Sequence, residues 1–317
     1  MPSRQTTRLS RDIRRRDVPS LLDALAPPQQ TAATAISVED LSHRFVEAGV
    51  EASPGRPPLA LLVHGFLSAA ECQSIVDRVA NSFIPSDRLY PPSYRNNSLF
   101  DMFDAPFAEA LYERMAPLLP TELVWPNRNT ATAVLQDVEL ATWRPCSLNQ
   151  LWRFSRYSNG QSFPPHLDGH YLPAPGLESK VSVTLYLNDN FEGGHTIFYS
   201  DKTLASEVLR VTPRTGTLAL FDHDLWHDGS PVVCQLERKN HDKIILRSDV
   251  VFALQGAQPM SEERSLQLAE RSERAAELIV AERPGASERV RCERAKRVRC
   301  KRAKRVKLRR GGRDERA

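Results

Sequence analysis

Short alternations of apolar and polar residues fill the chain between residues 151 and 254. The stretch 181–188, Val-Ser-Val-Thr-Leu-Tyr-Leu-Asn, repeats with a period of two, which is typical of a strand with one buried face. A comparable run covers 243–252, and Gly, Pro and Asp-Gly breaks separate such runs. This succession of short strands predicts a jelly roll, in which two facing sheets leave an open mouth at one end.

Helical patterns precede this region. A strand-like run at 59–63 is followed by Ser68-Ala-Ala-Glu71, a capping box that predicts the start of a helix. A second helix is expected over 105–118, and a short one over 38–48, where VEDLSHRFVEA has apolar residues at helical spacing. These elements are interpreted as support for the strand region.

Two histidines and one aspartate are the candidate chemical groups. His166 and Asp168 are separated by one residue, so on an extended segment their side chains point the same way and can bind one ion. His227 follows 61 residues after His166. Two imidazoles and one carboxylate can occupy one face of an octahedral Fe(II), which leaves three positions open. The pattern therefore predicts a catalytic iron site formed by His166, Asp168 and His227.

Blocks of residues in a fixed order surround these three positions. Together they resemble the iron- and 2-oxoglutarate-dependent oxygenases, on the prolyl 4-hydroxylase-like branch, and the resemblance covers roughly residues 58 to 254. The blocks are Arg153–Phe163 (RFSRYSNGQSF), Pro164–Tyr171 (PPHLDGHY), Val181–Asn188, Phe191–Phe198 (FEGGHTIF), Phe221–Gly229 (FDHDLWHDG) and Lys243–Phe252 (KIILRSDVVF).

The resemblance implies a mainly β fold with supporting helices (α+β), the double-stranded β-helix or cupin-like jelly roll. It implies a dioxygenase that needs Fe(II), 2-oxoglutarate and O2, with ascorbate as a candidate further reductant. The expected reaction hydroxylates a C–H bond, of a protein prolyl or other side chain, and releases succinate and CO2. A small-molecule oxygenase, a nucleic-acid oxygenase and an inactive oxygenase fold that serves as a binding module are the alternatives.

The family binds the distal carboxylate of 2-oxoglutarate with a cation on the strand after the second histidine. Here Lys243 and Arg247 share one face of that strand, about 13 Å apart at the usual rise per residue. The residue nearer the iron-bound end is expected to bind, and alignment of the strand core indicates Lys243. Extra residues at 235–242 leave Arg247 as the alternative. Tyr157 and Thr196 match further family positions beside the co-substrate.

The net charge of +4 combines two opposite parts. Residues 289–310 hold thirteen Lys or Arg and one Glu, a local charge of +12, so the remainder carries −8. The sequence therefore predicts a disordered basic tail that contacts a polyanion or an import receptor. An acidic body argues against a nucleic-acid track around the site.

The predicted organisation has three parts. Residues 1–57 are a flexible N-terminal extension, 58–254 the dioxygenase domain with its core at 150–254, and 255–317 a charged helical segment followed by the tail. The spacing of the five cysteines indicates no disulfide framework. The sequence has no apolar run of about twenty residues, so no membrane contact is expected. The cytoplasm or nucleus is the expected location, with the mitochondrion as the weaker alternative.

Overall fold

The computed structural model describes residues 18–25, 36–51, 56–88, 90–91, 95–126, 140–233 and 242–255. All of these belong to one compact unit, Pro2–Pro259. The helix predicted after residue 261 and the basic tail lie outside the described residues, and both stay predictions. Within the described part of the chain, no helix is long and apolar enough to cross a membrane.

A ten-stranded sheet forms the larger layer of the fold. Its strands run in the order β1-β2-β13-β9-β16-β7-β4-β3, and β6 pairs with both β16 and β5. Every pairing in it is antiparallel. The strands are β1 (Ser37–Asp40), β2 (Ala60–His64), β3 (Ile84–Pro85), β4 (Ser98–Phe103), β5 (Leu123–Pro126), β6 (Leu140–Leu148), β7 (Leu151–Tyr157), β9 (Leu177–Tyr186), β13 (Leu218–Asp222) and β16 (Lys243–Leu254).

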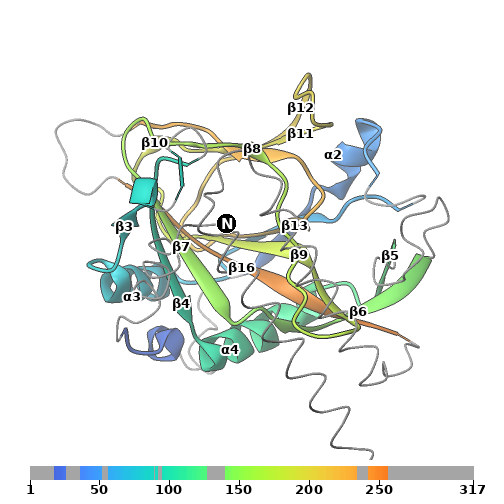
Figure 1. Ribbon diagram of the computed structural model, residues 1–317, viewed down its shortest axis with the longest axis horizontal. Coiled ribbons are helices and arrows are strands. Elements are labelled where there is room, and N and C mark those ends of the chain that lie inside the picture. Colours follow the sequence, from blue (N-terminus) through green and yellow to red (C-terminus); the bar gives the residue numbers. More distant parts are fainter. Residues whose placement is uncertain are drawn as a thin grey trace, which may run out of the picture. The chain divides into compact units, whose positions relative to one another are not determined.

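A four-stranded sheet in the order β12-β11-β14-β8 forms the opposing layer. Figure 1 shows it across from the strands β13, β9, β16 and β7 of the large sheet. This arrangement confirms the predicted mainly β jelly roll. The strands are β8 (Phe163–His166), β11 (Thr196–Tyr199), β12 (Glu207–Val211) and β14 (His227–Gly229), and a separate pair joins β10 (Glu192–Gly193) to β15 (Val232–Val233).

Two longer helices cover the outer face of the large sheet (Figure 1). The predicted capping box begins α3 (Ala69–Val79): Ser68 Oγ accepts from the Glu71 N–H, and the Glu71 carboxylate accepts from the Ser68 N–H. Asp104 caps α4 (Ala105–Met115), which is followed by the short η4 (Ala116–Leu118). Both helices bury apolar faces against the sheet, on the side away from the candidate site.

Alternation along β9 separates two environments. Val181, Val183 and Leu185 point outward into the core beneath the helices. Ser182 and Thr184, on the opposite face, point into the space between the two sheets, because successive side chains of a strand alternate. A second apolar cluster, built around Tyr186 and Phe198, closes part of that space. The interior between the sheets is therefore partly polar, which is where the candidate site lies.

The packed unit extends upstream of residue 58, the predicted domain start. A 3-10 helix, η1 (Leu21–Ala24), buries Leu21 in the outer core, and α2 (Ser42–Glu47) buries Phe45 against the smaller sheet. The helix predicted over 38–48 is shorter than expected, because Ser37–Asp40 instead form β1 on the edge of the large sheet. All four side chains of β1 are exposed, so its backbone pairing left no hydrophobic pattern to read. A further 3-10 turn, η3 (Ser86–Arg88), precedes β4.

Candidate active site

His166, Asp168 and His227 meet between the two sheets. His166 ends β8 and His227 begins β14, and these two residues are direct partners in the smaller sheet. Their ring centroids lie 4.3 Å apart. His166 Nε2 is 3.5 Å from Asp168 Oδ1, and His227 Nε2 is 3.8 Å from Asp168 Oδ2. One ligand atom from each lies within 4.8 Å of the others, so the three side chains could hold one metal ion.

Backbone carbonyls orient both imidazoles. His166 Nδ1 lies 2.9 Å from the Pro164 carbonyl oxygen, and His227 Nδ1 lies 2.9 Å from that of Leu225. A carbonyl only accepts, so each Nδ1 carries the proton and each Nε2 keeps a free lone pair. Burial lowers the pKa of His227 to about 4 against the attraction of Asp168, so this ring is neutral at pH 7. A neutral nitrogen donor is what a metal ion needs.

Asp168 is buried and ionised. Burial opposes its ionisation, but the adjacent charge of Arg247 outweighs burial and holds its pKa well below the usual range. Oδ2 accepts from Ser182 Oγ at 2.5 Å and lies 2.5 Å from Arg247 Nη2. Oδ1 faces His166 Nε2. Because Oδ2 has two partners, Oδ1 is the oxygen that remains for a metal.

A chain of hydrogen bonds sets the orientation of this carboxylate. Ser182 Oγ also lies 2.8 Å from His223 Nδ1, and His223 Nε2 lies 2.9 Å from Ser179 Oγ. Since Ser182 donates to Asp168, its oxygen accepts the His223 Nδ1–H, and Ser179 donates to Nε2. Burial lowers the pKa of His223 to about 4, which keeps it neutral as this requires. Ser179 Oγ in turn accepts from the Tyr171 N–H at 2.8 Å.

Removal of the hydroxyl next to Asp168 should weaken metal binding. We expect Ser182→Ala to lower metal affinity by about 10- to 100-fold, the usual effect of losing a partner that orients a ligand. Isothermal titration with Co(II) measures this. Ser248→Ala is the matched control, because this buried serine donates to the Asn149 carbonyl and has no contact with the three ligands. Equal affinities of the two variants would rule out the orienting role of Ser182.

A pocket opens beside the three ligands and contains the other predicted residues. Lys243 is 3 % exposed, and its Nζ donates to the Gly194 carbonyl at 2.6 Å. Its ammonium lies 5.5 Å from the centre of the Tyr157 ring. Thr196 Oγ1 shares a hydrogen bond of 2.7 Å with Tyr186 Oη. Lys243, Tyr157 and Thr196 all line the pocket together with His166, His227 and Arg247.

Gly194, the second glycine of the Gly193-Gly194 pair, packs against the side chain of Lys243. Gly194 has a φ of +60°, and a Cβ placed there would lie 3.1 Å from Lys243 Cδ and 3.0 Å from the Phe191 ring. A side chain at this position would adopt a strained backbone conformation and would require the lysine and the Phe191 ring to shift by a few tenths of an ångström. The second glycine of the Phe191–Phe198 block thus has a local role in placing the cation.

The two candidate cations occupy different ends of the pocket. Arg247, and not Lys243 as expected, lies at the end with the three ligands, where it pairs with Asp168 and lies 3.6 Å from Asp249 Oδ1. Lys243 lies four residues earlier on the same strand face and has no carboxylate within ion-pair distance among the described residues. The expectation that Lys243 lies nearer the metal-ligand end of the strand was therefore wrong, and its role as the receptor for a carboxylate stays a prediction.

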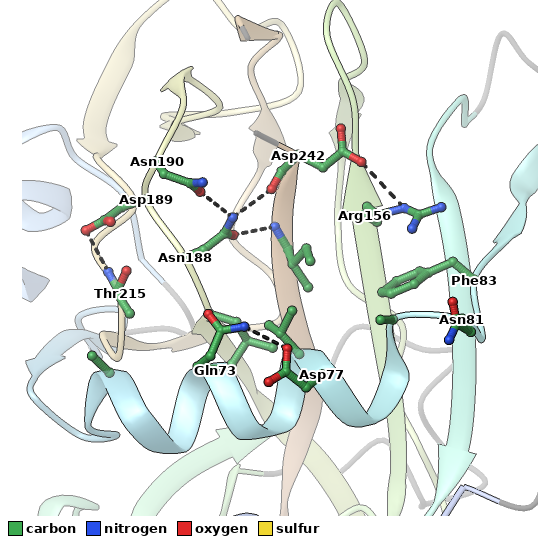
Figure 2. Close-up of a pocket in the computed structure, with 15 residues that line it drawn as sticks. Gln73, Asp77, Asn81, Phe83, Arg156, Asn188, Asp189, Asn190, Thr215 and Asp242 are labelled. Atoms are coloured by element: carbon green, nitrogen blue, oxygen red, sulfur yellow. Dashed lines mark hydrogen bonds and ion pairs between the residues drawn. The ribbon is translucent and has the colours of Figure 1, made fainter. Parts of the chain in front are cut away.

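A larger groove of about 770 Å³ lies elsewhere, along α3 (Figure 2). None of the predicted site residues lines it. Its polar side chains bond to one another: Gln73 donates to Asp77, and Asn188 bonds to the Ile244 N–H and the Asp242 carbonyl. The groove is therefore separate from the chemistry, although Asn188 fixes the start of the strand that carries Lys243.

The fold and site define a class. A jelly roll that brings two imidazoles and one carboxylate together, next to a buried cation, suits a mononuclear Fe(II) oxygenase that binds an acidic co-substrate. Residues 152–245 match the family model described as the 2OG-Fe(II) oxygenase superfamily. This matched segment carries all three candidate ligands, and it is similar to dioxygenases that use Fe(II) and 2-oxoglutarate. The superfamily predicted from the sequence is confirmed.

Several solved structures are similar to this chain, whereas none of the curated proteins compared with it matches. A collagen prolyl hydroxylase of Paramecium bursaria Chlorella virus-1 is 19% identical over 64% of this chain and 99% of its own, with a TM-score of 0.37. A Pseudomonas putida prolyl-4-hydroxylase is 17% identical over 68% and 100%, with a TM-score of 0.38. A Phytophthora capsici prolyl 4-hydroxylase is 15% identical over 74% of each chain, with a TM-score of 0.36.

Proposed function

We propose that His166, Asp168 and His227 hold the catalytic Fe(II) and that this site hydroxylates a C–H bond of a protein side chain, for which a prolyl ring is the first candidate. The observation that carries the metal assignment is the convergence of two Nε2 lone pairs and Asp168 Oδ1, each set by its own hydrogen-bond partners. When bound, Fe(II) supplies the activation of O2. The residues of the chain bind and orient the reactants, and they exclude water from the site.

Lys243 is proposed as the receptor for the distal carboxylate of 2-oxoglutarate. A buried ammonium whose described partner is one carbonyl is poorly compensated, and a carboxylate would satisfy it. Tyr157 and Thr196 lie next to it in the same pocket. Arg247 is engaged by Asp168 and Asp249, so we assign it the task of holding the ligand carboxylate ionised rather than binding the co-substrate.

Exposed apolar side chains next to the metal ligands support a bulky primary substrate. Leu167, between two ligands, is 40 % exposed, and Tyr171 and Leu172 on the same loop are 41 % and 58 % exposed. Such a group beside a site is typical of a surface that a partner covers. A small-molecule substrate remains the second candidate. The two are separated by a screen of peptides and metabolites for stimulation of succinate release.

The proposed oxygenase activity is tested by measuring 2-oxoglutarate turnover in the absence of a primary substrate. We expect the purified chain to release succinate slowly when Fe(II), 2-oxoglutarate and O2 are present, and to stop when a chelator is added. A chain that binds Co(II) and 2-oxoglutarate but releases no succinate would instead be the inactive binding module. A chain that binds neither would contradict the site assignment.

The affinity for 2-oxoglutarate should fall as the pH rises. Burial lowers the pKa of Lys243 to about 7 against the attraction of Asp228, so above pH 7 the free enzyme carries a neutral amine. Binding of the carboxylate must then take up a proton, and each further pH unit costs up to about tenfold in affinity. Calorimetry of the Co(II) form in buffers of different ionisation enthalpy should show proton uptake near one at pH 8.5 and near zero at pH 6. Lys243→Met should show no uptake at either pH.

A further inference from the structure

Arg95 lies in the same pocket and is a buried cation with no anionic partner among the described residues. It is 6 % exposed and lines the pocket with His166, His227 and Lys243. No described residue accepts a hydrogen bond from its guanidinium or forms an ion pair with it, and its Nε is fully buried and unpaired. Buried charges are normally paired, because removal from water is costly. The unsatisfied donors therefore indicate a ligand.

The guanidinium is held in place by what surrounds it. Its carbon lies 4.2 Å from the centre of the Phe163 ring, and that ring lies 4.0 Å from the ring of His166. The Arg95 carbonyl accepts from Ser86 Oγ at 3.0 Å. The adjacent Asn96 side chain accepts from the Ser162 N–H at 3.2 Å, which joins this segment to the start of β8. Arg95 is thus preorganised on the side of the pocket formed by His166.

We infer that Arg95 binds a carboxylate of the primary substrate. A planar guanidinium with free donors matches a carboxylate in two parallel hydrogen bonds, and stacking on Phe163 leaves its edge available for them. The co-substrate is the less suitable occupant. Of its two carboxylates, one belongs with the keto group at the metal and the other has Lys243. This inference rests on the proposed function, and it narrows the substrate to an acidic compound or an acidic peptide.

The test uses matched pairs of acids and amides. Enzyme loaded with Co(II) and 2-oxoglutarate is titrated with N-acetylglycine and with N-acetylglycinamide, and binding is followed by ligand-observed NMR. A second pair, the α-amides of N-acetylaspartate and N-acetylasparagine, places the carboxylate on a side chain. We expect the acids to bind about 10- to 100-fold more tightly than the amides, the range for a charge-assisted hydrogen-bond pair. The pair with the larger preference shows whether the acid is terminal or part of a side chain.

Three variants decide whether Arg95 causes this preference. Arg95→Leu should abolish it, Arg95→Lys should keep part of it, and Arg144→Leu, a remote exposed arginine paired with Glu122, should leave it intact. The same titrations give the affinities for Co(II) and 2-oxoglutarate, so a failure of the metal site is recognised separately. The inference is overturned if the wild type binds acids and amides equally, or if Arg95→Leu keeps the preference. A large loss of 2-oxoglutarate affinity in Arg95→Leu would also overturn it, because Arg95 would then serve the co-substrate.

Discussion

Replacement of His227 by alanine is expected to abolish metal-dependent 2-oxoglutarate turnover while the domain stays folded. The change removes one of three ligands, and the loss in metal affinity should exceed the about 100-fold that accompanies loss of a residue which merely orients a ligand. His166→Ala should act in the same way. Titration with Co(II) and succinate release at saturating Fe(II) are the measurements, with circular dichroism to confirm folding.

The folded state should tolerate these changes because Asp168 keeps a partner. Its carboxylate remains paired with Arg247 and bonded to Ser182 when an imidazole is removed. His43→Ala is the matched control, since this exposed histidine lies in the first turn of α2, where its Nδ1 is 3.1 Å from the Asp40 carbonyl oxygen. Near-normal turnover in either ligand variant would show that another set of residues holds the metal.

Lys243→Met is expected to raise the dissociation constant of 2-oxoglutarate strongly while metal binding stays intact. Methionine fills much of the same space, so the charge is the main loss. The removal of one partner from a buried charge pair costs on the order of 2 to 5 kcal/mol, which corresponds to about 30- to several-thousand-fold in affinity. Calorimetric titration of the Co(II) form with 2-oxoglutarate gives the value directly.

Arg247→Ala provides the contrast to Lys243→Met. Arg247 is placed against Asp168, so its loss should alter metal affinity more than 2-oxoglutarate affinity. Lys202→Ala, an exposed lysine, controls for a general change in charge. If Arg247→Ala weakened 2-oxoglutarate binding more than Lys243→Met did, the role of receptor would move to Arg247.

Local patterns predicted those parts of the fold that local forces decide. The capping box at Ser68 and Glu71 predicted the start of α3, because the interaction is contained within four residues. The period of two along β9 predicted the alternation of its two faces, although not that both faces would be buried or what Ser182 would contact. The edge strand β1 was missed because its pairing with β2 depends on a partner more than twenty residues away and leaves no apolar side.

The site was predictable to the level of residue types and not of contacts. The motifs placed His166, Asp168 and His227 together, and the structure agrees with that grouping. Arg95 lies in none of the sequence blocks that carry the resemblance, and only the tertiary fold brings it over Phe163. The direction of β16 relative to the ligands also depends on the register between strands, in which Lys243 lies opposite Tyr157 and Arg247 opposite Arg153. No signal within the strand itself specifies that register.

Asn188 makes the position of Lys243 independent of the length of the preceding connection. Its side chain accepts from the Ile244 N–H and donates to the Asp242 carbonyl, so the chain is fixed to the end of β9 immediately around the lysine. The number of residues after Val233 therefore does not set where the cation lies. A site whose cation is held by such a side-chain contact can keep its geometry while the spacing of its residues in the sequence changes.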